Sequence, residues 1–184
     1  MSLEKLLQQK KSVILERWFD LILETYPADT RQFLKKKKNR FANPVAHEIA
    51  GGIEEIFNNI LKDANSEDVS PFLDKIIRIR AVQDFSPSQA LGFIFDLKKL
   101  IRDELAENMG ESRISEDLWE LERKIDAMGL MSLDIYTKCR EKLYELRVKE
   151  VKNRVGRLIE RANKMCGIPE KEGDPEVCST ENLT

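Results

Sequence analysis

The stretch SEDLWELERKIDAMGLMSLDIYTKCREKLYELRVKEVKNRVGRLIERANK, residues 115–164, decides the fold of this chain and contains no proline. Its apolar residues recur at intervals of three and four, which predicts one long α-helix. A helix of that length measures roughly 70 Å. A compact domain of this size is only about 35 to 40 Å across. We therefore expect something outside the domain to cover the far end of the helix.

The apolar pattern changes partway along this helix. Leu118, Leu121, Ile125, Met128 and Ile135 follow the spacing of a helix that packs on its own domain. From Tyr144 onward the spacing is four, three, four, three, as in a coiled-coil seam, and the predicted seam residues are Tyr144, Val148, Val151, Val155 and Leu158. The alternative is a helix that breaks at Gly129 or Gly156 and lies entirely on its own domain.

Capping signals place several shorter helices before the long one. Asn43-Pro44 and Ser86-Pro87-Ser88-Gln89 are typical helix starts, and the second also has the spacing of a capping box. A short helix from Asp29 is expected to bury Phe33 and Leu34. Gly51-Gly52 lies inside a helical pattern, where a closely crossing helix or a bound ligand would explain the pair.

The expected architecture is all-α, with six to eight helices and no strand pattern. We predict one domain over residues 1–164, which includes the long helix 115–164. Residues 165–184 are acidic and interrupted by proline, and they are expected to form a disordered tail.

Composition limits the classes of function. The chain of 184 residues has a net charge of −2, which gives no general reason to expect nucleic-acid binding. No run of eighteen apolar residues occurs, and the amino terminus does not resemble a signal peptide, so we expect a cytoplasmic protein without membrane insertion. One histidine and no Cys-x-x-Cys pair argue against a metal site. Cys139 fits the apolar stripe, whereas Cys166 and Cys178 lie in or beside the tail.

Three segments resemble a known family. They are Asn43-Pro44-Val45-Ala46-His47, the run from Ile79 to Ala90, and the run from Asp134 to Lys142 with the following Glu145-Leu146-Arg147. These segments are similar to the amino-terminal domain of the RsbR/RsbRD family, whose members are bacterial stressosome components and co-antagonists of the kinase RsbT. The likeness extends to about Val155.

The resemblance implies a non-haem, globin-like helical domain that dimerises and acts in stress signalling. In that family such a domain is often joined to a STAS domain, which is phosphorylated and builds the stressosome. No βα pattern follows the long helix here, so the expectation is a stand-alone sensory or adaptor module that pairs with a second copy and with another signalling or regulatory protein.

The globin likeness raises the question of haem. A globin's axial histidine would belong to the helix that runs here from Phe72 to Val82, and that segment contains none. We therefore expect no cofactor. The alternative function is a small-molecule or tetrapyrrole sensor or carrier, for which the pocket candidates are His47, Ile76, Phe93 and Phe95.

Catalysis is the third hypothesis, and the sequence does not favour it. No nucleophile elbow, phosphate-binding loop or paired metal ligands occur. Asp126 and Asp134 lie near the apolar face of the long helix, where pairing with a Lys or Arg of another helix is the ordinary explanation. We expect no enzyme activity and no catalytic residues.

Overall fold

The computed structural model describes residues 2–36, 43–62, 66–83, 85–106 and 112–166, and these residues form six α-helices and no strand. In chain order the helices are α1 (Leu3–Glu24), α2 (Ala28–Lys36), α3 (Pro44–Leu61), α4 (Ser66–Val82), α5 (Pro87–Glu104) and α6 (Ser112–Cys166). The described residues form the expected all-α, globin-like bundle, and the long helix is confirmed. Of the predicted tail, residues 165 and 166 are helical and end α6, and residues 167–184 lie outside the described residues.

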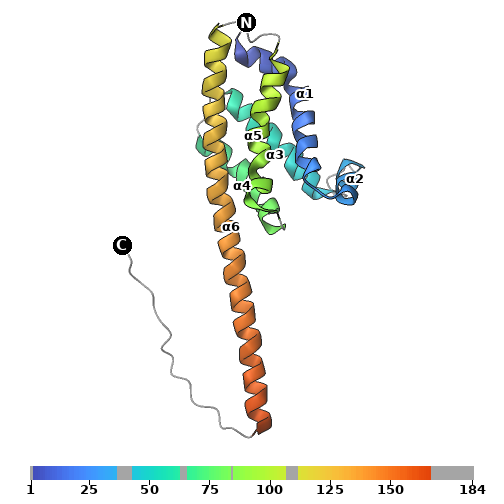
Figure 1. Cartoon of the computed structure of the whole chain (residues 1–184), viewed down its shortest axis with the longest axis vertical. Helices are drawn as coiled ribbons and strands as arrows, with labels where there is room; N and C mark the ends of the chain where they lie inside the picture. Colours follow the sequence, from blue (N-terminus) through green and yellow to red (C-terminus); the bar gives the residue numbers. More distant parts are fainter. Residues whose placement is uncertain (1, 37–42, 63–65, 84, 107–111, 167–184) are drawn as a thin grey trace, which may run out of the picture. The chain divides into compact units, whose positions relative to one another are not determined.

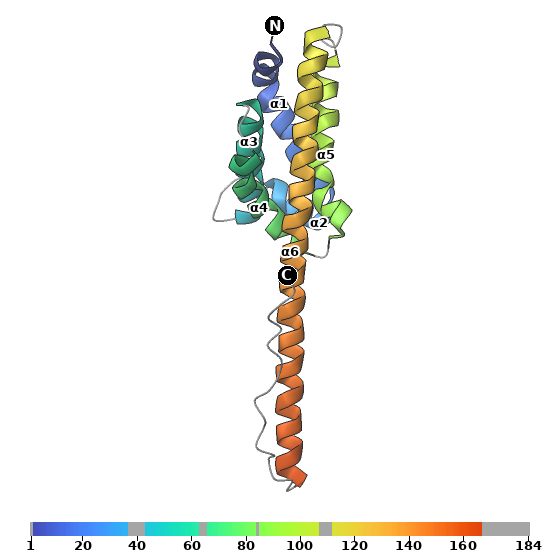
Figure 2. The same ribbon diagram turned by 90° about the vertical axis from the view of Figure 1, so that its left-hand side faces the viewer.

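The chain divides into two compact units, residues 1–142 and 143–184, and α6 contributes to both. Within the first unit α3 packs closely on α4, and α1 packs on α5. Figure 1 shows α5 between α1 and the first part of α6, while Figure 2 shows α3 and α4 next to each other. A single hydrophobic core joins these helices, with Trp18, Phe57, Phe93 and Leu73 among its fully buried side chains.

The two predicted helix starts are confirmed in detail. Asn43 caps α3, since its Oδ1 accepts a hydrogen bond from the backbone N–H of Ala46 at 3.1 Å. At the start of α5, Ser86 and Gln89 form a reciprocal capping box, with Pro87 as the first helical residue. These caps satisfy backbone N–H groups that have no partner inside the helix.

One expectation about the short helix α2 is wrong. Leu34 is buried as predicted, but Phe33 is 49% exposed. Neighbouring residues of a helix point about 100° apart, and in α2 the face that packs on the core carries Leu34 while Phe33 points away from it.

Gly52 is explained by the close crossing of α3 and α4. A Cβ atom at Gly52 would lie 2.8 Å from the Cδ1 atom of Ile76, so only glycine fits without a shift. Gly51 is different, because a Cβ atom there would meet nothing within 4 Å. The crossing helix therefore accounts for the second glycine and leaves the first unexplained.

Candidate functional site

The junction between α4 and α5 contains a fully buried cation, Arg80. Its Nε donates to the carbonyl oxygen of Ala90 at 2.9 Å, and its Nη2 donates to that of Gln89 at 2.7 Å. Nη2 also donates to the hydroxyl of Thr25 at 2.9 Å. One guanidinium therefore joins the last turn of α4 to the first turn of α5 and to the end of α1.

Aromatic rings surround the same guanidinium. The Cζ atom of Arg80 lies 4.5 Å from the ring centroid of Phe85 and 5.6 Å from those of Tyr26 and Phe93. The ring faces attract a cation and replace part of its lost hydration. Burial lowers the pKa of the Arg80 guanidinium and raises the pKa of the Tyr26 phenol. Arginine nevertheless remains charged in proteins.

One part of this guanidinium is not satisfied by the residues that the structure describes. Among the described residues, Nη1 of Arg80 has no hydrogen-bond partner, and no carboxylate forms an ion pair with the side chain. A buried cation held only by neutral groups costs free energy that a hydrophobic residue of similar size would not. Such a cost marks the junction as a candidate for function in addition to packing.

Two side chains of α6 bond to the backbone of this junction. The hydroxyl of Tyr136 donates to the carbonyl oxygen of Phe85 at 2.8 Å. Nη1 of Arg140 donates to the carbonyl oxygen of Ala81 at 3.1 Å. Both carbonyls lie where helical hydrogen bonding ends, so α6 completes the bonding of the α4–α5 junction. The junction and α6 are therefore joined by two side-chain hydrogen bonds.

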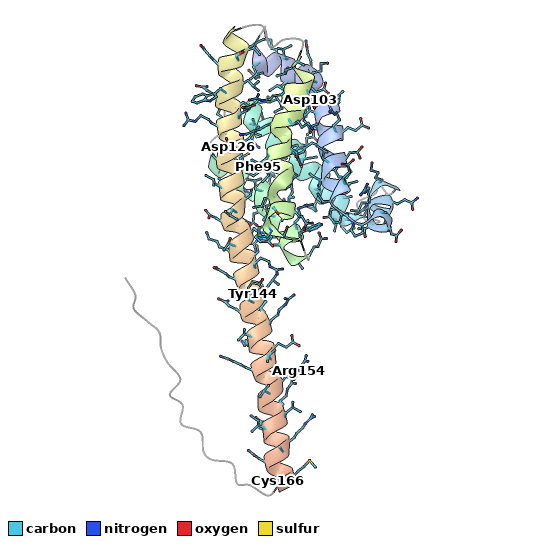
Figure 3. The ribbon with its side chains drawn as sticks, viewed as in Figure 1. Phe95, Asp103, Asp126, Tyr144, Arg154 and Cys166 are labelled. Carbon is cyan, nitrogen blue, oxygen red and sulfur yellow. The ribbon has the colours of Figure 1, made fainter. Side chains whose placement is uncertain are left out.

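The predicted seam residues all lie on the part of α6 that belongs to the second unit. Each is about half exposed, between 47% and 59%, and together they are called the seam stripe: Tyr144, Val148, Val151, Val155 and Leu158. Figure 3 shows side chains projecting from this segment, with Tyr144, Arg154 and Cys166 labelled. Glu150 and Arg154 form an ion pair across one helical turn, with Nη2 and Oε1 2.7 Å apart.

Sequence reasoning did not single out several exposed apolar residues of the first unit, among them Trp119, Leu130 and Leu133. A signal was available for Leu130. Continuing the seam repeat back from Tyr144 in steps of three and four residues passes Glu141, Thr137 and Asp134 and then reaches Leu130. Asp126 of α6 forms an ion pair with Lys98 of α5, which is the structural role that the sequence suggested for this carboxylate. Figure 3 labels Asp126 and Phe95.

The structure does not bring the four pocket candidates together. Ile76 packs against Gly52, and Phe93 lies beside Trp18 and Arg80 in the core. Phe95 is 45% exposed. His47 is exposed at the edge of a groove between α3 and α4 that also includes Gly51, Phe72 and Lys75. A tetrapyrrole site at these residues stays a prediction, which an absorption spectrum tests.

That groove is small. Its volume is about 230 Å³, whereas ligand pockets usually occupy ~300–1,000 Å³. In the part of the chain that the structure describes, no three His, Cys, Asp or Glu side chains lie together as a metal site would require. No described helix combines the length and the apolarity needed to cross a membrane.

Similarity to known proteins agrees with this architecture. The model of the family described as "RsbT co-antagonist protein rsbRD N-terminal domain" matches residues 12–151. The chain belongs to this family. The matched region of the RsbRD amino-terminal domain includes the α4–α5 junction, Tyr136 and Arg140, and the first three residues of the seam stripe.

A relative from Archaeoglobus fulgidus, named only as an uncharacterized protein, is 28% identical over 144 residues. The alignment covers 74% of this chain and 82% of that protein. No solved structure matches the chain significantly. Membership in the RsbRD family makes this a regulatory domain in broad terms.

Proposed function

We propose that this protein is a non-enzymatic regulatory module that pairs with a second copy through the seam stripe and relays the binding of another signalling protein through α6. The observation that carries the proposal is the pair of hydrogen bonds from Tyr136 and Arg140 to the α4–α5 junction. The same helix continues into the seam stripe. One element therefore contacts a costly buried cation site and also carries a surface suited to pairing.

The seam stripe supports pairing because it leaves apolar area in contact with water at coiled-coil spacing. Covering a half-exposed valine or leucine contributes on the order of 1 kcal/mol. Four such positions and Tyr144 on each of two copies give a free-energy gain that a polar helix surface would not provide. The expected arrangement is a seam in which each copy covers the stripe of the other.

Relay requires two packings that differ by only a few kcal/mol, so that a binding event shifts their populations. The junction fits this requirement, because its central guanidinium is incompletely bonded and has no carboxylate among its described partners. A partner that shifts the end of α4 would move the carbonyl acceptors of Tyr136 and Arg140, and α6 would respond.

The absence of catalysis is part of the proposal. Arg80 faces backbone carbonyls, a hydroxyl and aromatic rings, which leaves no open space beside it for a substrate. Many of the other described charged groups form surface pairs between helices, such as Arg17 with Glu104 and Arg102 with Glu122. Surface pairs of this kind are ordinary structural contacts.

The relay is tested by removing the two bonds from α6 to the junction. The double variant Tyr136→Phe/Arg140→Met keeps the volume of both side chains and removes both donors. We expect its dimer dissociation constant, measured by sedimentation equilibrium, to differ several-fold from wild type. Arg123→Met is the matched control, because Arg123 lies on α6 in the same unit and stacks on exposed Trp119. Equal dissociation constants for all three proteins would refute the relay.

A further inference from the structure

The described part of the second unit is strongly basic. Residues 143–166 contain seven Lys or Arg and three Glu, a net charge of +4, although the whole chain carries −2. Such a local excess within a weakly acidic chain indicates an interaction surface for negative groups.

The cations that border the seam stripe follow its repeat. Arg147, Arg154 and Arg161 stand seven residues apart. They immediately precede Val148, Val155 and Ala162, which are the a positions of the coiled-coil repeat. In coiled-coil terms they occupy successive g positions, and Lys152 occupies an e position on the other border. We call these four residues the basic flank: Arg147, Lys152, Arg154 and Arg161.

A second copy of the chain does not neutralise the basic flank. In a parallel pair each g position faces the e position of the next repeat, which places Arg147 opposite Lys152 of the second copy. Arg154 and Arg161 then face Ile159 and Cys166. In an antiparallel pair g faces g, so arginine faces arginine. The parallel arrangement has fewer like-charge contacts, yet it still leaves the flank without carboxylates.

Among the residues that the structure describes, one member of the flank has an ion-pair partner. Arg154 pairs with Glu150 at 2.7 Å. Arg147, Lys152 and Arg161 form neither an ion pair nor a side-chain hydrogen bond with any described residue. Three cations on each copy therefore have no ion-pair partner among the described residues and border the proposed seam.

We propose that the basic flank binds an acidic segment of another protein, with carboxylates repeating about every seven residues along a helix. The inference rests on the proposed function, in which the seam stripe itself is occupied by a second copy. It adds the chemical class of the signalling partner and the residues that recognise it. Cations at fixed seven-residue spacing match a helical partner, because i and i+7 of a helix lie on one face.

The apolar residues beside the flank favour a protein over a membrane surface. Helices that lie in the membrane interface usually present Trp, Phe and Leu to the lipid. The seam stripe consists mainly of valine, which suits helix–helix packing. Anionic vesicles and duplex DNA therefore enter the experiment as competing outcomes.

The test measures binding of a fluorescent twenty-residue poly-glutamate peptide to the full chain by anisotropy at low salt. Arg147→Glu/Arg161→Glu is the flank variant. Lys149→Glu/Lys164→Glu is the matched control, because it changes the net charge equally and lies away from the seam pattern. We expect the flank variant to bind at least tenfold more weakly than wild type, about 1.4 kcal/mol, and the control to lose less than threefold.

Equal losses in the two variants would show that net charge alone attracts the peptide and would overturn the proposal. The proposal would also be overturned if the wild type bound anionic vesicles or duplex DNA more tightly than the peptide and the flank variant lost that binding. Sedimentation separates this result from the proposed function. A glutamate at position 147 faces Lys152 of a parallel second copy, so the flank variant stays dimeric. A monomeric variant would instead count against the seam.

Discussion

The ring of Phe95 on α5 lies directly over Gly129 of α6. A Cβ atom at position 129 would stand 2.3 Å from Cζ of that ring, well inside any permitted contact. Glycine in a helix interior costs about 1 kcal/mol relative to alanine. The close approach of the ring accounts for this cost, and it makes Gly129 a packing residue instead of the helix break considered from the sequence.

This contact predicts that the effect of Gly129→Ala on the free energy of unfolding depends on the residue at position 95. In the wild-type background, Gly129→Ala must displace the Phe95 ring, so we expect no gain or a loss in the free energy of unfolding. In the Phe95→Ala background, Gly129→Ala should stabilise the protein by about 1 kcal/mol, because only the helix propensity remains. Urea denaturation measures all four proteins. The same effect in both backgrounds would show that the ring does not occupy this position.

The adjacent glycines of α3 give a second prediction with its own internal control. Gly51→Ala should raise the free energy of unfolding by up to about 1 kcal/mol, since nothing lies within 4 Å of the added atom. Gly52→Ala should lower it, since the added atom meets Ile76. Thermal and urea denaturation check the two signs. A loss on Gly51→Ala would indicate an unseen contact at the groove beside His47.

The burial of Arg80 predicts that its substitution lowers the free energy of unfolding by an unusually large amount for a single arginine. Arg80→Ala should lower the free energy of unfolding by about 3–5 kcal/mol, because it leaves a cavity and removes the link between three helices. Arg80→Met should cost less, since it fills the space and removes a buried charge. The control is Arg78→Ala on the same helix, which loses only an exposed pair with Asp74 and should change the free energy of unfolding little. Similar losses at positions 78 and 80 would contradict the burial of Arg80.

The contact of Glu122 with Arg102 predicts that the free energy of unfolding depends on pH in the acid range. Its hydrogen bond with Arg102 holds the pKa of the carboxyl below the usual 4.5. A carboxyl with a depressed folded-state pKa stabilises the fold above its unfolded pKa, and this contribution is lost as pH falls through the folded value. Glu122→Gln should therefore destabilise the protein at pH 7 and much less at pH 3, as measured by urea denaturation. Glu120→Gln, at an exposed position on the same helix, should show no such difference.

Local sequence signals predicted much of the fold because their physical causes are local. The caps at Asn43 and Ser86 depend on side chains within three residues of the backbone groups they bond. The long helix follows from proline-free, periodic residues, and a buried serine fills the gap in its apolar stripe at Ser132. Such features require no knowledge of what the helices pack against.

The candidate site could not be predicted from the sequence, because its contacts join residues that are far apart in the chain. In the sequence, Arg80 lies near the end of a helix, where a cation is ordinarily solvated. Its burial depends on Thr25, Phe85 and Ala90, which lie outside α4. Phe95 and Phe93 lie on one broad apolar belt, so spacing alone cannot tell which is covered. Only the approach of α6 at Gly129 distinguishes Phe95, which stays half exposed.

The seam is tested most directly by sedimentation velocity on the wild-type chain, on Val151→Lys/Val155→Lys and on Leu146→Lys. Leu146 is a suitable control because it is 54% exposed on the same helix but lies outside the seam pattern. A dimeric wild type, a monomeric double variant and a dimeric control are predicted. A wild type that sediments as a monomer, or a double variant that sediments as the wild-type dimer does, would contradict the proposed pairing.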